Sequence, residues 1–181
     1  MLVLTIKGRE KFDEEKQEFI EAKDHTIWLE HSLVSVSKWE SKWHVPFLYE
    51  KQPKTNEQIV DYIRCMTITQ NVDPSLYYDL DNDAIDKIQK YIDDPMTATT
   101  IHDERGAKKS SEIITSELIY YWMIANNIPV EFEKWHLNRL LTLIKVCSVK
   151  NTPPKKMSKR ATMTSNAALN AARRKAHNTR G

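Results

Sequence analysis

The chain has 181 residues, a formal net charge of +2 and only three glycines. Its hydrophobic fraction of 40%, which includes sixteen aromatic residues, is sufficient for one buried core. Phosphate-binding loops of the Walker and Rossmann types need closely spaced glycines, so these modes of nucleotide binding are excluded. Composition therefore predicts a single domain with an appendage.

The small net charge hides two segments of opposite sign. Residues 150–181 carry five lysines, four arginines and no acidic residue, which gives +9. Residues 1–149 carry 18 basic and 25 acidic side chains, which gives −7, and they contain every aromatic residue. We therefore expect a core-forming body over residues 1–150 and a basic tail over residues 151–181. The tail has too few large apolar residues to fold by burial, so we expect it to be flexible or helical only when bound.

The expected fold class is mainly α, with a small β-hairpin at the N-terminus of the helical body. Leu2–Ile6 and Thr26–Glu30 have the composition of the two strands that form this hairpin. From Ser32 onward apolar residues recur at helical spacing, and Pro46 ends this first helix.

Three short helical segments are expected in the middle of the chain. Thr55, with a glutamine three residues later, forms a capping box that opens a helix reaching about Ile68. Asp73 begins a short helical turn. Asp83 is expected to cap the next helix, over Ala84–Ile92.

The last two helices of the body contain the most apolar residues. Ser110 or Ser111 is expected to cap the first, which ends before a tight connection at residues 126–129. Its apolar face is predicted to consist of Ile114, Leu118, Tyr121, Trp122 and Ala125, widened by Ile113, Ile119 and Ile124. The second helix is expected over residues 130–149. Because it is apolar on most sides, we expect it to be the buried central helix, with Trp135 in the core.

The sequence predicts no catalytic, cofactor-binding or metal-binding residues. The six histidines show no ligand spacing with each other or with cysteines and carboxylates. Asp79, Asp81 and Asp83 have the spacing of a calcium loop, but Ala84 and Lys90 occupy the positions where such a loop needs glycine and glutamate. Helix capping explains these acids better. We therefore expect a binding protein that is not an enzyme.

The sequence also gives an expectation of where the protein acts. The N-terminus becomes charged after six residues, too early for the core of a signal peptide, and no apolar run approaches the length of a membrane span. Cys65 and Cys147 lie in apolar helical patterns, as small buried residues do, and predict no disulfide framework. A cytosolic protein without membrane contact is expected.

Two sets of residues are candidates for partner binding. The aromatic set lies on and just after the first helix and consists of Trp39, Trp43 and Phe47. A core position is the competing interpretation of this set. The basic set lies in the tail and consists of Lys155, Lys156, Lys159, Arg160, Arg173, Arg174 and Lys175. The basic residues suit phosphates or carboxylates, and the competing interpretation is a solubilising terminus.

Several segments resemble one protein family. They are SVSKWESKWHVPFL (35–48), EQIVDYIRCMTITQNVDP (57–74), DDPMTATTI (93–101), ITSELIYYWMIANNIPVEFEKWHLNRLLTLIKVC (114–147) and NAALNAARRKAHNTRG (166–181). Together they are similar to the tail assembly chaperone family of tailed bacteriophages. The resemblance covers most of the chain from Ser35 onward.

The resemblance implies a helper protein that acts in the host cytoplasm and is not part of the virion. Such a protein binds the tape measure protein, keeps that long helical chain soluble and helps to recruit tail-tube subunits. It implies no cofactor and no catalytic residue. Two alternatives stay open: a structural virion protein of the head–tail region, and a nucleic-acid-associated accessory factor that uses the basic tail. Homo-oligomerisation is compatible with each.

Overall fold

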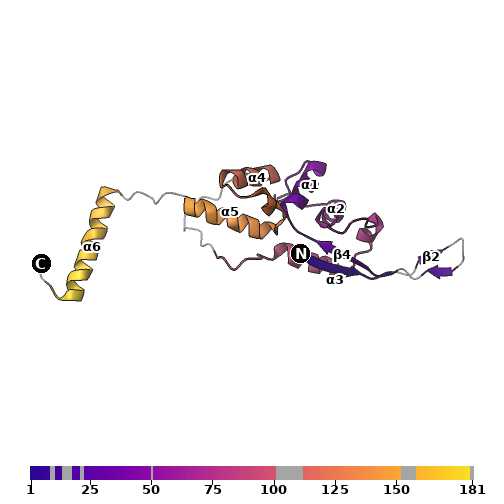
Figure 1. The fold of residues 1–181 in the computed structure, drawn as a ribbon, viewed down its shortest axis with the longest axis horizontal. Coiled ribbons are helices and arrows are strands. Elements are labelled where there is room, and N and C mark those ends of the chain that lie inside the picture. Colours follow the sequence, from indigo (N-terminus) through magenta and orange to yellow (C-terminus); the bar gives the residue numbers. More distant parts are fainter. Residues whose placement is uncertain are drawn as a thin grey trace. The chain divides into compact units, whose positions relative to one another are not determined.

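The computed structural model describes residues 1–8, 11–13, 18–20, 23–49, 51–100, 112–151 and 158–179. It is mainly helical with a small antiparallel hairpin near the N-terminus, which confirms the predicted fold class (Figure 1). The chain divides into two compact units, Met1–Ser148 and Val149–Gly181, which are called the body and the tail unit below.

The hairpin of the body forms where the sequence predicts it. Strand β1 (Leu2–Ile6) pairs antiparallel with β4 (His25–Leu29). Alternate residues of a strand point to opposite faces, so Leu4 and Ile27 are buried opposite each other while Trp28 is exposed. The buried face of the hairpin packs into the helical core.

The other described elements up to residue 151 are β2 (Lys11–Asp13), β3 (Glu18–Ile20), α1 (Leu33–Trp43), α2 (Asn56–Met66), η1 (Pro74–Tyr78), α3 (Asn82–Asp93), α4 (Ser116–Ala125), η2 (Val130–Lys134) and α5 (Leu137–Asn151), whose last three residues belong to the tail unit. The predicted capping box at Thr55 is present, and Ser32 and Ser35 form another at the start of α1. Strands β2 and β3 form a second antiparallel pair that the sequence did not predict.

Two predicted helix starts are wrong. Asp81 rather than Asp83 caps α3, because its carboxylate accepts the N–H of Ala84 at 2.7 Å. Helix α4 begins only at Ser116, with Thr115 as its cap. The proposed caps Ser110 and Ser111 lie outside the described residues. In both cases the capping hydrogen bond, rather than the first apolar residue, determines where the helix begins.

The predicted helix over residues 130–149 is interrupted. The 3-10 turn η2 ends before Trp135, and α5 begins at Leu137. The break has a tertiary cause: the N–H of Leu137 donates to the carbonyl of His31 at 2.7 Å, and His136 forms an isolated β-bridge with Ser32. Trp135 is therefore half-buried beside this break, stacked on Phe132 at 4.1 Å between ring centres, and is not at the centre of the core.

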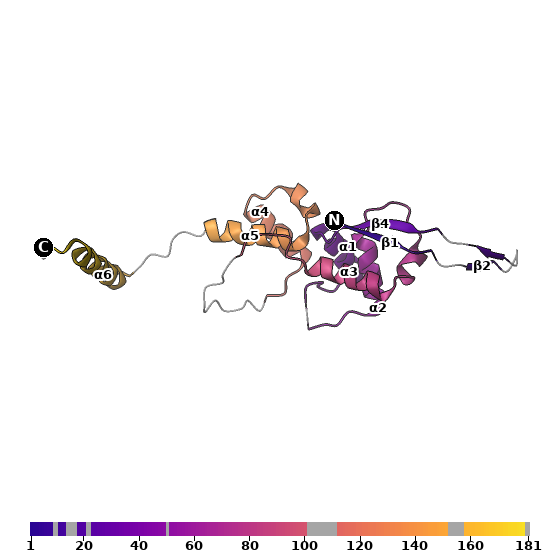
Figure 2. The ribbon, with the colours of Figure 1, turned by 90° about the horizontal axis from the view of Figure 1, so that it is seen from below.

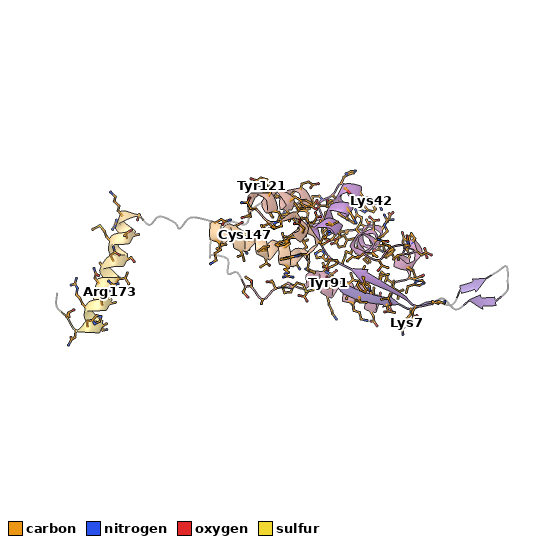
Figure 3. All side chains as sticks on the ribbon, viewed as in Figure 1. Lys7, Lys42, Tyr91, Tyr121, Cys147 and Arg173 are labelled. Carbon is orange, nitrogen blue, oxygen red and sulfur yellow. The ribbon has the colours of Figure 1, made fainter. Side chains whose placement is uncertain are left out.

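Helix α4 buries only part of the broad apolar face that the sequence predicts. Ile119 and Met123 are almost completely buried, and α4 packs on α1. Tyr121 and Ile124 are 62% and 71% exposed, and Figure 3 shows Tyr121 at the outer side of the helix. Because α4 is apolar on all sides, the spacing of its apolar residues does not identify the buried face.

The segment between β4 and α1 joins most elements of the body. Glu30 N–H donates to the carbonyl of Met66 at the end of α2 at 2.9 Å. The Glu30 carboxylate accepts the Tyr91 hydroxyl of α3 at 2.6 Å and pairs with the N-terminal ammonium of Met1 at 3.1 Å. With the bond from Leu137 to His31, this segment is tied to the start of β1 and to α2, α3 and α5.

Two buried histidines lie at this junction. His31 Nδ1 is hydrogen-bonded to the Tyr62 hydroxyl, and the His31 and His136 rings are 5.1 Å apart. His136 Nε2 is bonded to the Tyr91 carbonyl at 2.9 Å. Burial, reinforced by the neighbouring His136, lowers the pKa of His31 from 6.5 to about 3, while Asp93 acts weakly in the opposite direction. The folded body therefore holds His31 neutral.

The tail unit is helical, with α6 spanning Lys159–His177. Ser158 caps it by accepting the N–H of Ala161 at 3.2 Å. None of the described residues of the tail unit is buried. The helix thus forms without a core of its own.

The His31 environment predicts acid-sensitive stability. In the unfolded chain His31 binds a proton as the pH falls through 6.5, but in the folded body only near pH 3, so stability is lost as pH falls below 6.5. Between pH 7 and pH 5 we expect protonation of His31 to lower the free energy of unfolding by about 2 kcal/mol. Urea denaturation at the two pH values measures this change. In His31→Asn, which keeps a polar atom near the Tyr62 hydroxyl but does not titrate, the loss over this interval should shrink by about that amount. An unchanged pH dependence in the variant would contradict the prediction.

Candidate functional site

Trp39 belongs to the core rather than to a partner-binding surface. Its side chain has no exposed surface, its Nε1 donates to the Gln58 carbonyl at 2.8 Å, and its ring meets the edge of Phe47. The prediction that Trp39 contacts a partner is therefore corrected. Its role is to hold α1 against α2.

Trp43 is half-buried and also joins α1 to α2. Its Nε1 donates to Asp61 Oδ2 at 2.9 Å, while Lys42 Nζ lies 2.6 Å from Asp61 Oδ1. Burial alone would raise the pKa of Asp61, but the hydrogen bonds from Lys42 and Trp43 outweigh it and lower that pKa. The ring of Trp43 is therefore fixed by a charged hydrogen-bond network.

Phe47, the third aromatic candidate, lies at an apolar groove. We call this the α2–α3 groove; its walls are α2, α3 and residues 47, 48 and 52–54, and its volume is about 490 Å³. It is lined by Phe47, Leu48, Gln52, Pro53, Lys54, Ile59, Tyr62, Ile63, Ile85, Ile88, Gln89, Ile92 and Asp93. The two helices are seen in the body in Figure 2.

The groove combines a buried floor with accessible sides. Tyr62, Ile63 and Ile88 are each less than 5% exposed and form the floor. Ile59 on α2 and Ile85 on α3 are each 42% exposed. Helical spacing explains the arrangement, since residues three or four apart share one face of a helix. The apolar spacing along one helix does not by itself reveal whether another element covers that face.

The rim of the groove carries one cation and one anion. Lys54 Nζ lies 4.5 Å above the centre of the Phe47 ring, and burial lowers the pKa of Lys54. Asp93 accepts a hydrogen bond from Gln89 Nε2 at 2.9 Å. Among the ion pairs of the described residues, none involves Lys54.

The wall that carries Phe47 is held by a buried carboxylate. Glu40 Oε1 accepts the backbone N–H of Phe47 at 2.7 Å, and Glu40 Oε2 accepts that of Ser116 at 2.7 Å. The Phe47 ring also stacks on Tyr62, with ring centres 4.0 Å apart. One side chain on α1 thus fixes both the groove wall and the first residue of α4.

Of the seven basic tail residues predicted to bind a partner, the structure describes five. Lys155 and Lys156 lie outside the described residues. On α6 the remaining five lie near its two ends and are exposed: Lys159, Arg160, Arg173, Arg174 and Lys175. At 1.5 Å per residue the two groups are about 20 Å apart. Figure 3 shows Arg173 projecting from α6.

The groove has the chemistry of a binding surface. Its titratable lining residues are Lys54, Tyr62 and Asp93, and no histidine, cysteine or serine lines it. Across the described ranges, no cluster of three or more histidine, cysteine, aspartate or glutamate side chains is arranged to hold a metal ion. The helices in those ranges also lack the combined length and apolarity of a membrane span.

Comparisons with protein families, with curated proteins and with solved structures found no match to this chain.

The Glu40 contacts predict how the groove wall is weakened. Glu40→Gln replaces one acceptor oxygen by an amino group, so one of the two buried N–H donors loses its partner. We expect a loss of about 1–3 kcal/mol in the free energy of unfolding, measured by urea denaturation. Glu131→Gln, at an exposed position of η2, is the control and should change stability by less than about 0.5 kcal/mol. Equal effects of the two substitutions would show that Glu40 does not fix the wall.

Proposed function

We propose that this protein is a tail assembly chaperone of a tailed bacteriophage, which binds the tape measure protein and assists assembly of the tail tube. The α2–α3 groove is the observation that carries this proposal. Amphipathic helices bind by placing their apolar face in such grooves, and a tape measure protein is a long helical chain. The resemblance over residues 35–48, 57–74 and 114–147 supports the same function.

The dimensions of the groove suit a helical client. Ile85, Ile88 and Ile92 line the groove from one helix. The first and the last are seven residues apart, which is a rise of about 10 Å or two helical turns. Ile59 faces the groove from the other helix. A client helix with apolar residues at positions i, i+3 or i+4, and i+7 would cover both exposed isoleucines, which stabilises the complex by removing apolar surface from water.

The basic helix α6 would add electrostatic attraction to the binding of the client. Its five exposed basic side chains attract acidic stretches of a client and accelerate encounter, an effect that falls as the salt concentration rises. The groove then provides the apolar contact. In this proposal the protein acts in the host cytoplasm and is left out of the finished particle.

A nucleic-acid-associated role is the second candidate, and the basic side chains of α6 favour it. The described residues of α6 include no aromatic residue that would stack on bases, so contact would be limited to phosphates. Such binding weakens steeply between about 50 and about 200 mM salt. Binding of the tape measure protein through the groove should change much less over this interval.

Co-expression tests the proposed function. Together with the tape measure protein of the same genome, the full chain should raise the soluble fraction of that protein several-fold, and purified particles should lack this chain. A variant with glutamine at the five basic positions of α6 keeps the length of the tail. It should raise the soluble fraction of the tape measure protein less than the wild type does. An insoluble tape measure protein, together with a fixed number of copies of this chain in each particle, would contradict the proposal and favour the structural virion protein.

A further inference from the structure

We propose that, in the absence of a client, the α2–α3 groove of one molecule binds helix α4 of a second copy, with Glu117 of that copy paired to Lys54. Among the exposed apolar surfaces that the described residues of the body form are the groove, which is concave, and the outer face of α4, which is convex. The inference goes beyond the proposed function because it concerns the free protein and needs no client.

The outer face of α4 has the pattern that the groove requires. Glu117, Tyr121 and Ile124 follow each other at spacings of four and three residues, so they lie on one side of the helix. They lie opposite Ile119 and Met123, which are buried against the body. The resulting stripe has one acidic residue at its N-terminal end, followed by two large exposed apolar side chains.

The two surfaces match in length. Glu117 and Ile124 are seven residues apart, as are Ile85 and Ile92 on α3, and seven residues of α-helix rise about 10 Å. Two turns of α4 therefore fit along two turns of the groove wall. Tyr121 and Ile124 would then cover Ile59 and Ile85, so that exposed apolar surface on both copies is removed from water together.

The charges also match. Lys54 is a partly buried cation without an ion-pair partner among the described residues, and burial disfavours its charged form. Glu117 is exposed, and hydrogen bonds from its own backbone N–H and from Thr115 lower its pKa, so the carboxylate is ionised at neutral pH. The Ser116 hydroxyl also donates to it, at 3.3 Å, and a carboxylate has about four acceptor positions, so a further donor can be accommodated. A carboxylate beside Lys54 would offset the cost of holding that cation away from water.

The rim charges argue against other occupants. One lysine and one aspartate line the groove, so the site has no excess of positive charge to attract a polyanion. The proposed contact is heterologous, because the groove of one copy meets a different surface, α4, of the next. At each end of an assembly one copy still has a free groove or a free α4, so further copies can add until a ring closes or a chain grows. Blocking either surface stops this growth.

Two single substitutions test this geometry. Ile85→Asp blocks the groove and leaves α4 intact, whereas Ile124→Asp blocks α4 and leaves the groove intact. Both positions are exposed, at 42% and 71%, so both variants should fold, which circular dichroism can verify. In sedimentation velocity of the full chain, the wild type should associate with rising concentration between about 1 and about 100 µM, and each variant should stay monomeric. An equimolar mixture of the two should form a 1:1 dimer and nothing larger.

Charge reversal provides the second test. Lys54→Glu and Glu117→Lys should each weaken association roughly tenfold, and the double variant should recover it. Lys90→Glu, the same charge change at an exposed position of α3 outside the groove, is the control and should associate like the wild type.

Several outcomes would overturn the proposal. A wild-type protein that stays monomeric over the whole concentration range excludes self-association. Association that survives Ile85→Asp but not Ile124→Asp would indicate a symmetric contact between two α4 helices. Association that survives both would place the contact elsewhere, for example between the basic tail and the acidic body. None of these results depends on the tape measure protein, so failure here is distinguishable from failure of the proposed function.

Discussion

The fold of the body depends on the backbone and side-chain contacts of one short segment, residues 29–32. Its carbonyl and N–H groups pair with the end of α2 and the start of α5, and Glu30 ties α3 and the N-terminus to it. Beside it, two histidines are buried with hydrogen bonds to Tyr62 and to the carbonyl of Tyr91. Burial disfavours the charged form of His31, so this part of the body tolerates little protonation of that side chain.

The α2–α3 groove is a consequence of this junction. The contacts of residues 29–32 fix the C-terminal ends of α2 and α3, while Glu40 fixes the wall that carries Phe47. These contacts fix the three walls of the groove through residues that lie toward the core. The opposite side of the groove is open to solvent. The same carboxylate of Glu40 caps the first N–H of α4, so the two surfaces proposed to meet between copies are supported by one residue.

The sequence predicted most helices and the N-terminal hairpin, but not β2 and β3, the break at Trp135 or which side chains of α4 are exposed. Alternation along Leu2–Ile6 and the capping box at Thr55 are local signals, and both are confirmed. The break at Trp135 was missed because the N–H of Leu137 is bound by His31, more than a hundred residues earlier in the chain. The groove was missed for a related reason. Ile85 has the periodicity of a core residue, and only the tertiary arrangement shows that no described element covers it fully.

The central claim is that the α2–α3 groove, rather than the basic tail, receives the apolar helix of the client. Hydrogen–deuterium exchange of the full chain, with and without the tape measure protein, tests it most directly, at a concentration where the free chain is monomeric. Binding in the groove should slow exchange of the backbone amides in residues 52–63 and 85–93, which include most of the lining residues. Slower exchange confined to residues 159–177, with the groove walls unchanged, would contradict it.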